Sequence, residues 1–321
     1  MAFGLRFTRR RIAFVAAIVT VGLAVFGARY YLSLGIAHVT RPLSFYKTPF
    51  SPSTNPLRRA YATTLYNDAY VPGALLLGHS LVRHGMLSDS VAQSMLLLYI
   101  PGRVSNASLE LLATEGWMLR AVERIPPPET KKAAHNFQDQ YTKLRLFELE
   151  DEFDAVFYMD ADMLAVRPFP EIWSFPAPFA SARDVRMGYG WLPTINAGSL
   201  LLKPNKRLLK DMLTLAPTLR YDGTFAEQAL LNAYWARDLT MLPYIYNGQL
   251  GIKRVYPKHW EAFAHDVRII HYTGTKPWEW HEESDMPLER AQWWWAWDEM
   301  ETARATKGLS SLGTLGRQPS K

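Results

Sequence analysis

The sequence predicts an α/β protein with a mostly parallel, Rossmann-like sheet flanked by helices. Segments typical of strands and helices alternate four times before residue 160, as they do in parallel sheets with covered faces. The most apolar strand segment ends abruptly in two carboxylates, Asp160 and Asp162. Of the 321 residues, 48% are hydrophobic, which suffices for one large core or two modest ones. Ligands of such sheets bind at the carboxyl ends of the strands.

Each element follows from a local pattern. Apolar, aromatic and β-branched runs predict strands at 59–66, 93–100, 117–125 and 154–159. Helical spacing of apolar residues predicts helices at 72–84, 105–115 and 139–149, and the first of these stops before Gly85. We therefore expect a folded body over residues 58–302 and a disordered tail of Gly, Ser, Thr and basic residues at 303–321.

Charge and cysteine content exclude several classes of protein. The formal charge of +6 comes from basic residues near the two ends, namely Arg6, Arg9, Arg10, Arg11, Arg304, Lys307, Arg317 and Lys321. Without these eight residues the formal charge is −2, so nothing indicates a nucleic-acid partner. The chain has no cysteine, which excludes disulfides, thiolate chemistry and zinc sites built on cysteine.

The N-terminal region predicts a membrane anchor. Residues 12–28 carry no charge and would span roughly 26 Å as a helix, against about 30 Å for a bilayer core. The arginines before them predict a cytosolic basic tail at 1–11, a transmembrane signal anchor at 12–36 and a Pro-rich stem at 37–57. We expect a single-pass type II membrane protein whose catalytic domain lies in the Golgi or endoplasmic reticulum lumen. A signal peptide cleaved near Ala28 is the alternative.

The acidic doublet predicts a metal site. Asp160 and Asp162 follow the apolar run 156–159, and only the small Ala161 separates them. Carboxylates this close repel one another unless a cation lies between them. Both can turn toward one hard divalent ion, whose remaining positions diphosphate oxygens can fill. Acid-x-acid triplets also occur in surface turns, but the apolar flanks on both sides favour a metal-assisted nucleotide site.

Six segments in a fixed order resemble a known family. They are TLYNDAYVPGALLLGHSL, YTKLRLFEL, YMDADML, NAGSLLLKP, AEQALLN and HYTGTKPW. Together they resemble glycosyltransferase family 8, the glycogenin-like group, as a membrane-anchored member of fungal type. The resemblance implies a GT-A fold for residues 58–302, a Mn²⁺ ion, a UDP-sugar donor and transfer with retention of anomeric configuration.

The resemblance also implies the site residues. The metal ligands would be Asp160, Asp162 and His271. UDP-sugar contacts would come from Thr64, Tyr66, Asn67, Tyr70, Lys143, Asp160, Ala161, Asp162, Asn196, Ala197, Gly198, Gln228, His271, Gly274 and Lys276. The catalytic candidates are Gln228, Glu227 and Asp184. Two departures from the family pattern stand out: Glu227 replaces an aspartate, and Ala197 replaces a serine.

The expected reaction moves a hexose or related sugar from a UDP-sugar to a hydroxyl of a carbohydrate, polyol or glycoconjugate. Mn²⁺ and Lys276 would stabilise the UDP leaving group. Front-face attack by the acceptor is the preferred mechanism, and double displacement through Glu227 or Asp184 remains open. Two other classes also remain open: a phosphohydrolase of the haloacid-dehalogenase type, and an inactive carbohydrate-binding membrane protein.

Overall fold

The computed structural model describes residues 57–87, 93–175, 178–185, 194–236, 238–279 and 286–316. The predicted basic tail, membrane anchor and nearly all of the stem lie outside these ranges. None of the helices within these ranges has the length and apolar character needed to cross a membrane. The last α-helix continues to Thr306, beyond the domain boundary expected at 302, and its Arg304 is buried in an ion pair with Glu115.

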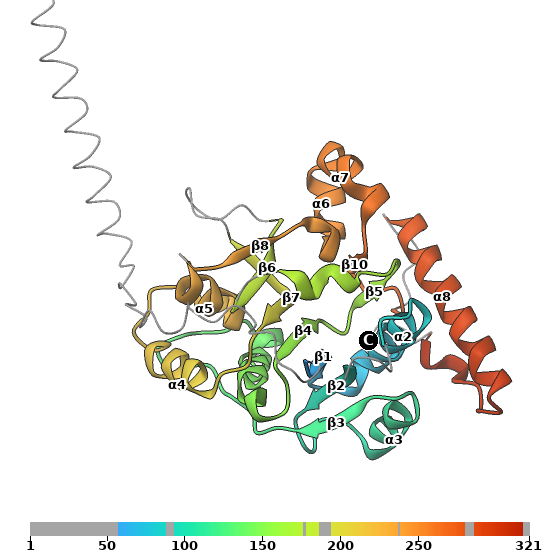
Figure 1. The fold of residues 1–321 in the computed structure, drawn as a ribbon, viewed down its shortest axis with the longest axis horizontal. Coiled ribbons are helices and arrows are strands. Elements are labelled where there is room, and N and C mark those ends of the chain that lie inside the picture. Colours follow the sequence, from blue (N-terminus) through green and yellow to red (C-terminus); the bar gives the residue numbers. More distant parts are fainter. Residues whose placement is uncertain are drawn as a thin grey trace, which may run out of the picture.

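The main sheet has seven strands in the order β3-β2-β1-β4-β7-β6-β8 (Figure 1). In chain order they are β1 (Arg59–Leu65), β2 (Gln93–Tyr99), β3 (Met118–Ala121), β4 (Ala155–Met159), β6 (Phe179–Arg183), β7 (Ile195–Leu202) and β8 (Thr240–Leu242). Strand β7 runs antiparallel to both β4 and β6, whereas the other neighbouring strands pair in parallel. The sheet is therefore mixed, with one reversed strand in an otherwise parallel arrangement.

Helices cover both faces of this sheet. Successive side chains of its strands point to opposite faces, so each face contributes to its own core. One core contains Tyr61 and Phe157 and packs against α2 (Val71–Arg83) and α8 (Pro287–Thr306). The other core contains Ala60 and Val156. It packs against the 3₁₀ helix η4 (Gln140–Asp151), α4 (Lys206–Leu215) and α5 (Ala226–Trp235). The two modest cores are thus the two faces of one sheet.

The helix expected at 139–149 forms as η4, which is 3₁₀ rather than α-helical. A 3₁₀ helix has three residues per turn, so side chains spaced by three lie on one face. Tyr141, Leu144 and Phe147 have this spacing, and each is at most 1% exposed. Apolar spacing of three and four residues alternates in this segment, so the sequence pattern alone did not separate the two helix types.

A second, three-stranded sheet continues from the acidic doublet. It consists of β5 (Met163–Ala165), β10 (Ile269–His271) and β9 (Gly248–Gln249), in the order β5-β10-β9. Strand β10 is antiparallel to β5 and parallel to β9, and His271 is paired with Met163 and Gln249. Residues 160–162 join β4 of the main sheet to β5. This junction brings His271 beside the doublet despite its distance in sequence.

Shorter elements complete the described fold. The remaining α-helices are α3 (Asn106–Thr114), α6 (Leu250–Val255) and α7 (Pro257–Phe263). Short 3₁₀ helices are η2 (Asp68–Tyr70), η3 (His135–Phe137), η5 (Pro170–Ser174), η6 (Gly223–Phe225), η7 (Tyr244–Tyr246), η8 (Ala264–Asp266) and η9 (Gly313–Gly316). Helices α6 and α7 lie above β10 in the view of Figure 1.

Candidate active site

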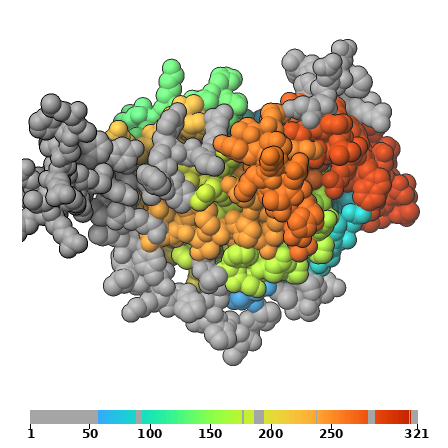
Figure 2. Space-filling view, turned by 90° about the horizontal axis from the view of Figure 1, so that it is seen from above, coloured from blue at the N-terminus to red at the C-terminus, as the bar shows by residue number. Residues whose placement is uncertain are grey.

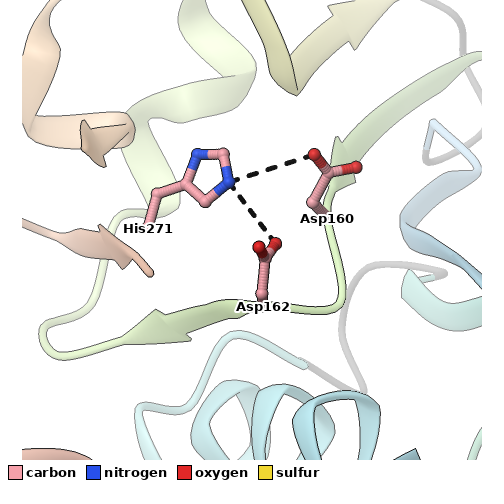
Figure 3. Close-up of side chains that lie close together, drawn as sticks. All are labelled: Asp160, Asp162 and His271. Atoms are coloured by element: carbon pink, nitrogen blue, oxygen red, sulfur yellow. Dashed lines mark ion pairs between the residues drawn. The ribbon is translucent and has the colours of Figure 1, made fainter. Parts of the chain in front are cut away.

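The acidic doublet and His271 converge at the junction of the two sheets (Figure 3). His271 Nε2 lies 3.4 Å from Asp162 Oδ1 and 4.0 Å from Asp160 Oδ2. One ligand atom from each residue falls within 4.8 Å of the others. Ligands of one divalent ion lie at most about 4 to 5 Å apart, so the three atoms fit a single ion. Two carboxylates and an imidazole form a ligand set that transition-metal divalent ions accept.

A hydrogen-bond chain fixes the orientation of the His271 ring. The fully buried Asn247 has its Oδ1 2.9 Å from His271 Nδ1. With the proton on Nδ1, the ring donates to Asn247 and turns the lone pair of Nε2 toward the aspartates. Asn247 Nδ2 in turn donates to Asn196 Oδ1 (3.0 Å), which also accepts from the Gly198 amide (3.0 Å). The side-chain oxygen of Asn196 therefore already accepts two hydrogen bonds within the site.

Gly198 is required by the position of the His271 ring. A Cβ atom at residue 198 would lie 2.4 Å from His271 Cε1 and 2.8 Å from Asn196 Oδ1. Both neighbours are hydrogen-bonded to Asn247, so moving either of them would disturb that chain of hydrogen bonds. The glycine expected here as a donor-sugar contact thus serves first to admit the histidine.

Lys276 lies on the other side of the doublet. Its ammonium group forms an ion pair with Asp162 Oδ2 and donates to the Tyr272 carbonyl (3.0 Å). Burial, the largest influence, acts to raise the pKa of Asp162, but Lys276 and His271 outweigh it and hold that pKa well below its ordinary value. Asp162 is therefore ionised and ready to bind a cation. Gly274, expected in the same loop, has a φ of +93°, which favours glycine even though the space beside it is open.

Lys143 connects Asp160 to Glu227. Its ammonium group lies 3.0 Å from Asp160 Oδ1, 2.8 Å from Glu227 Oε1 and 3.1 Å from the Ala197 carbonyl. The contact to the Ala197 carbonyl is a hydrogen bond, and the contacts to the two carboxylates are ion pairs. Burial acts to lower the pKa of Lys143, but Asp160 and Glu227 outweigh it and raise that pKa above its ordinary value. Lys143 is a fixed internal cation that holds two carboxylates.

The catalytic candidates form one hydrogen-bonded group around the start of α5. Gln228 Nε2 donates to Asp184 Oδ2 (2.7 Å), and Gln228 Oε1 accepts from the Ala197 amide (2.9 Å). Glu227 is 4% exposed, and burial raises its pKa although Lys143 opposes this effect. The preceding residue, Ala226, has a φ of +46°, a strained conformation for a residue with a side chain. The local backbone thus turns Glu227 and Gln228 inward at the cost of strain.

The residues expected to hold the nucleotide fall into two groups. Tyr70 lies near the doublet, with its ring 5.8 Å from Trp278 and 5.6 Å from the Lys276 ammonium. Tyr66 has a buried hydroxyl with no hydrogen-bond partner among the described residues. In contrast, the Thr64 hydroxyl bonds to Tyr158, and Asn67 Oδ1 accepts from the backbone of Ala69 as the cap of η2.

The first helix packs tightly against the doublet. A Cβ atom at Gly73 would lie 2.2 Å from the Ala161 carbonyl and 2.7 Å from the Trp278 ring. Trp278 Nε1 donates to the Ala69 carbonyl (3.0 Å), which ties the C-terminal motif to the nucleotide loop. The N-terminal end of α2 therefore supports the turn that carries Asp160 and Asp162.

Two residues that the sequence analysis missed support the ligands directly. Asn247 orients His271, and the Tyr158 hydroxyl donates to Asp160 Oδ1. The Lys143 ammonium also lies over the Tyr158 ring, 4.8 Å from its centroid. The hydroxyl of a tyrosine in a buried strand needs a hydrogen-bond partner, and this need was the one sequence feature that could have indicated a role for Tyr158 in the site. Asn247 follows a short 3₁₀ helix and no local pattern distinguishes it.

The chain is similar in sequence to known proteins. The chain is 31% identical over 227 residues to glycogenin of Neurospora crassa, covering 68% of this chain and 31% of that protein. It is 27% identical over 268 residues to UDP-glucuronate:xylan alpha-glucuronosyltransferase 2 of Arabidopsis thaliana, covering 77% of this chain and 42% of that protein. The chain thus spans less than half the length of these two relatives.

A solved structure shares the fold. The galactosyltransferase LgtC, in complex with donor and acceptor sugar analogs, matches 75% of this chain and 95% of its own with a TM-score of 0.55 and 15% identity. This likeness confirms a GT-A-type α/β fold with a mixed sheet flanked by helices. The sequence profile of Glycosyl transferase family 8 matches residues 64–282, more than half of the chain, and so the chain belongs to that family.

Proposed function

We propose that the chain transfers a hexose or related sugar from a UDP-sugar to an acceptor hydroxyl, with Mn²⁺ and with retention of configuration. The convergence of Asp160, Asp162 and His271 next to Lys276 is the observation that carries this proposal. Family membership and the GT-A fold favour this activity over a phosphohydrolase or an inactive carbohydrate-binding protein.

Asp160, Asp162 and His271 would hold the ion, which when bound supplies positive charge to the diphosphate. Lys276 uses two of its three N–H donors on Asp162 and Tyr272 and has no third hydrogen-bond partner among the described residues. The remaining donor can meet a leaving phosphate oxygen. Tyr70, beside Lys276, offers an aromatic ring at the same end of the site.

Front-face attack by the acceptor hydroxyl agrees with the state of the two nearby carboxylates. Glu227 is bound by Lys143, and Asp184 accepts from Gln228, so each is already stabilised as a hydrogen-bond or ion-pair partner. A nucleophilic carboxylate would have to give up that interaction. Mass spectrometry of the protein after incubation with a slow donor analogue tests the choice: a covalent glycosyl adduct on either residue would establish double displacement.

The donor is tested by measuring UDP release by the full chain. The panel contains UDP-glucose, UDP-galactose, UDP-xylose, UDP-N-acetylglucosamine and UDP-glucuronate, the last because one relative compared above is named for it. Each donor is assayed with Mn²⁺, with Mg²⁺ and with chelator. Asp162→Asn is the matched negative control. Absence of UDP release for every donor with metal present would contradict the proposal.

We further propose that residues 12–36 anchor the chain as a type II protein of the Golgi or endoplasmic reticulum. The uncharged run and the preceding arginines support this topology. A C-terminal tag protected from protease in sealed microsomes, and exposed after detergent, is the expected result. Digestion of the tag without detergent would contradict it.

A further inference from the structure

Asn106 opens the only Asn-x-Ser/Thr sequence of the chain. Asn106, Ala107 and Ser108 form an N-glycosylation sequon, in which the middle residue is not proline. None of the other seven asparagines has serine or threonine two positions later. A three-residue match occurs often by chance, so the surroundings of Asn106 in the fold decide what the match means.

The fold leaves the Asn106 side chain exposed and unused. Asn106 is the first residue of α3, and Ser105 and Ala107 beside it are exposed as well. An asparagine near a helix start often caps the helix, but here Ser105 is the cap, and its Oγ accepts from the Ser108 amide (3.3 Å). The side-chain amide of Asn106 has no hydrogen-bond partner among the described residues, so its nitrogen is open to modification.

A contact of Ser105 shows where the sequon lies relative to the candidate active site. The Ser105 amide donates to Asp68 Oδ1 (3.0 Å), and Asp68 is the first residue of η2, in the loop expected to hold the nucleotide. Helix α3 lies at the lower edge of the ribbon in Figure 1, on the side away from the orange surface that Figure 2 shows. A group attached to Asn106 would therefore leave the surface seen in Figure 2 uncovered.

The sequon is also accessible before the domain folds, when a chain entering the secretory pathway meets the glycosylation machinery. Helix α3 has nine residues, and an isolated helix of that length is marginal in water. Leu112 is its buried residue, and it packs against α2 and β3. Because β3 follows α3 in the chain, α3 gains this packing only after β3 has been made. Asn106 and Ser108 are therefore presented in an extended segment.

We propose that Asn106 carries an N-linked oligosaccharide. The Asn106 Nδ2 atom forms a bond to C1 of an oligosaccharide that is carried on a polyprenyl diphosphate. The bond from C1 to the phosphate oxygen breaks, the lipid diphosphate leaves, and the amide nitrogen loses one proton. This inference rests on the lumenal topology proposed above. It does not depend on the proposed reaction, because no contact joins Asn106 to the metal-ligand group among the described residues.

Enzymatic removal of N-glycans from the full chain, expressed in cells with a secretory pathway, tests the proposal. Digestion with peptide N-glycosidase should lower the mass of the chain by that of a single glycan, and peptide mass spectrometry should then find aspartate at position 106. Asn106→Gln and Ser108→Ala should each abolish the mass change, because the sequon needs both the amide and the hydroxyl. Ser108→Thr keeps the hydroxyl and should retain the glycan, which makes it the matched control.

A second sequon separates a failure at Asn106 from a failure of the topology. Asp222→Asn completes a sequon with Gly223 and Thr224 on an exposed turn, and an asparagine can keep the capping bond to the Thr224 amide. A glycan at position 222 without one at position 106 would support the topology and overturn the proposal. A chain modified at neither position would overturn both. The glycan is scored by mass, so the result does not depend on whether the chain releases UDP.

Discussion

Lys143 and Lys276 each form an ion pair with one aspartate of the doublet, yet they differ in what they have left to offer. The Lys143 ammonium lies within 3.1 Å of three oxygens, of Asp160, Glu227 and Ala197. Lys276 has two such partners among the described residues. Both ammonium groups are buried, so burial does not distinguish a structural lysine from a substrate-binding one. The number of oxygens already around each ammonium group distinguishes them, with three at Lys143 and two at Lys276 among the described residues.

Substitution of Lys143 should have the largest effect on stability. Lys143→Met leaves the buried carboxylate of Glu227 without its cation and removes one from the partly exposed Asp160, which should lower the free energy of unfolding by about 3 kcal/mol. Urea denaturation of the variant measures this loss, and Lys206→Met, at an exposed ion pair, is the control expected near wild type. Unchanged stability together with lost activity would instead make Lys143 a substrate contact.

Lys276 should show the opposite pattern. Lys276→Met removes the donor proposed for the leaving phosphate and should lower the rate of UDP release by about 100- to 1000-fold. The thermal midpoint should move less than in Lys143→Met, because only one carboxylate loses its cation. Lys276→Arg, which retains the charge, should recover part of the rate. A variant that releases UDP at the wild-type rate would remove Lys276 from the reaction.

The sequence predicted the parts of the site that follow a local pattern. The apolar strand expected before Asp160 and Asp162 is β4, and the strand expected before His271 is β10, which includes His271 as its last residue. The resemblance supplied the pairing of the doublet with His271, which no spacing could show across two sheets. The contacts of Lys143 with Asp160, Glu227 and Ala197 could not be predicted, since these partners come from different segments. Nor could the reversal of β7, because strand direction depends on tertiary pairing rather than on side-chain alternation.

A substitution of Asn247 tests whether the hydrogen bond to His271 orients this metal ligand, and its expected effect is smaller. Asn247→Ala removes the acceptor that orients His271, and should weaken Mn²⁺ binding by about 10- to 100-fold. Titration of Mn²⁺ by electron paramagnetic resonance gives the affinity. Asn247→Asp keeps an acceptor for Nδ1 and should bind more tightly than the alanine variant. Equal affinities of the two variants would mean that the hydrogen bond to His271 does not orient the ligand.

The smallest effect concerns Glu227 on the Lys143 side. Burial raises the pKa of Glu227 above its ordinary value, so the folded protein holds this proton more tightly than the unfolded chain. Its contribution to stability is complete below the unfolded pKa and is lost as pH rises through the folded pKa. Glu227→Gln stays neutral throughout. The free energy of unfolding of wild type, measured by urea denaturation, should therefore fall relative to that of the variant across this range, and a parallel pH profile would show that Lys143 fully compensates the buried charge.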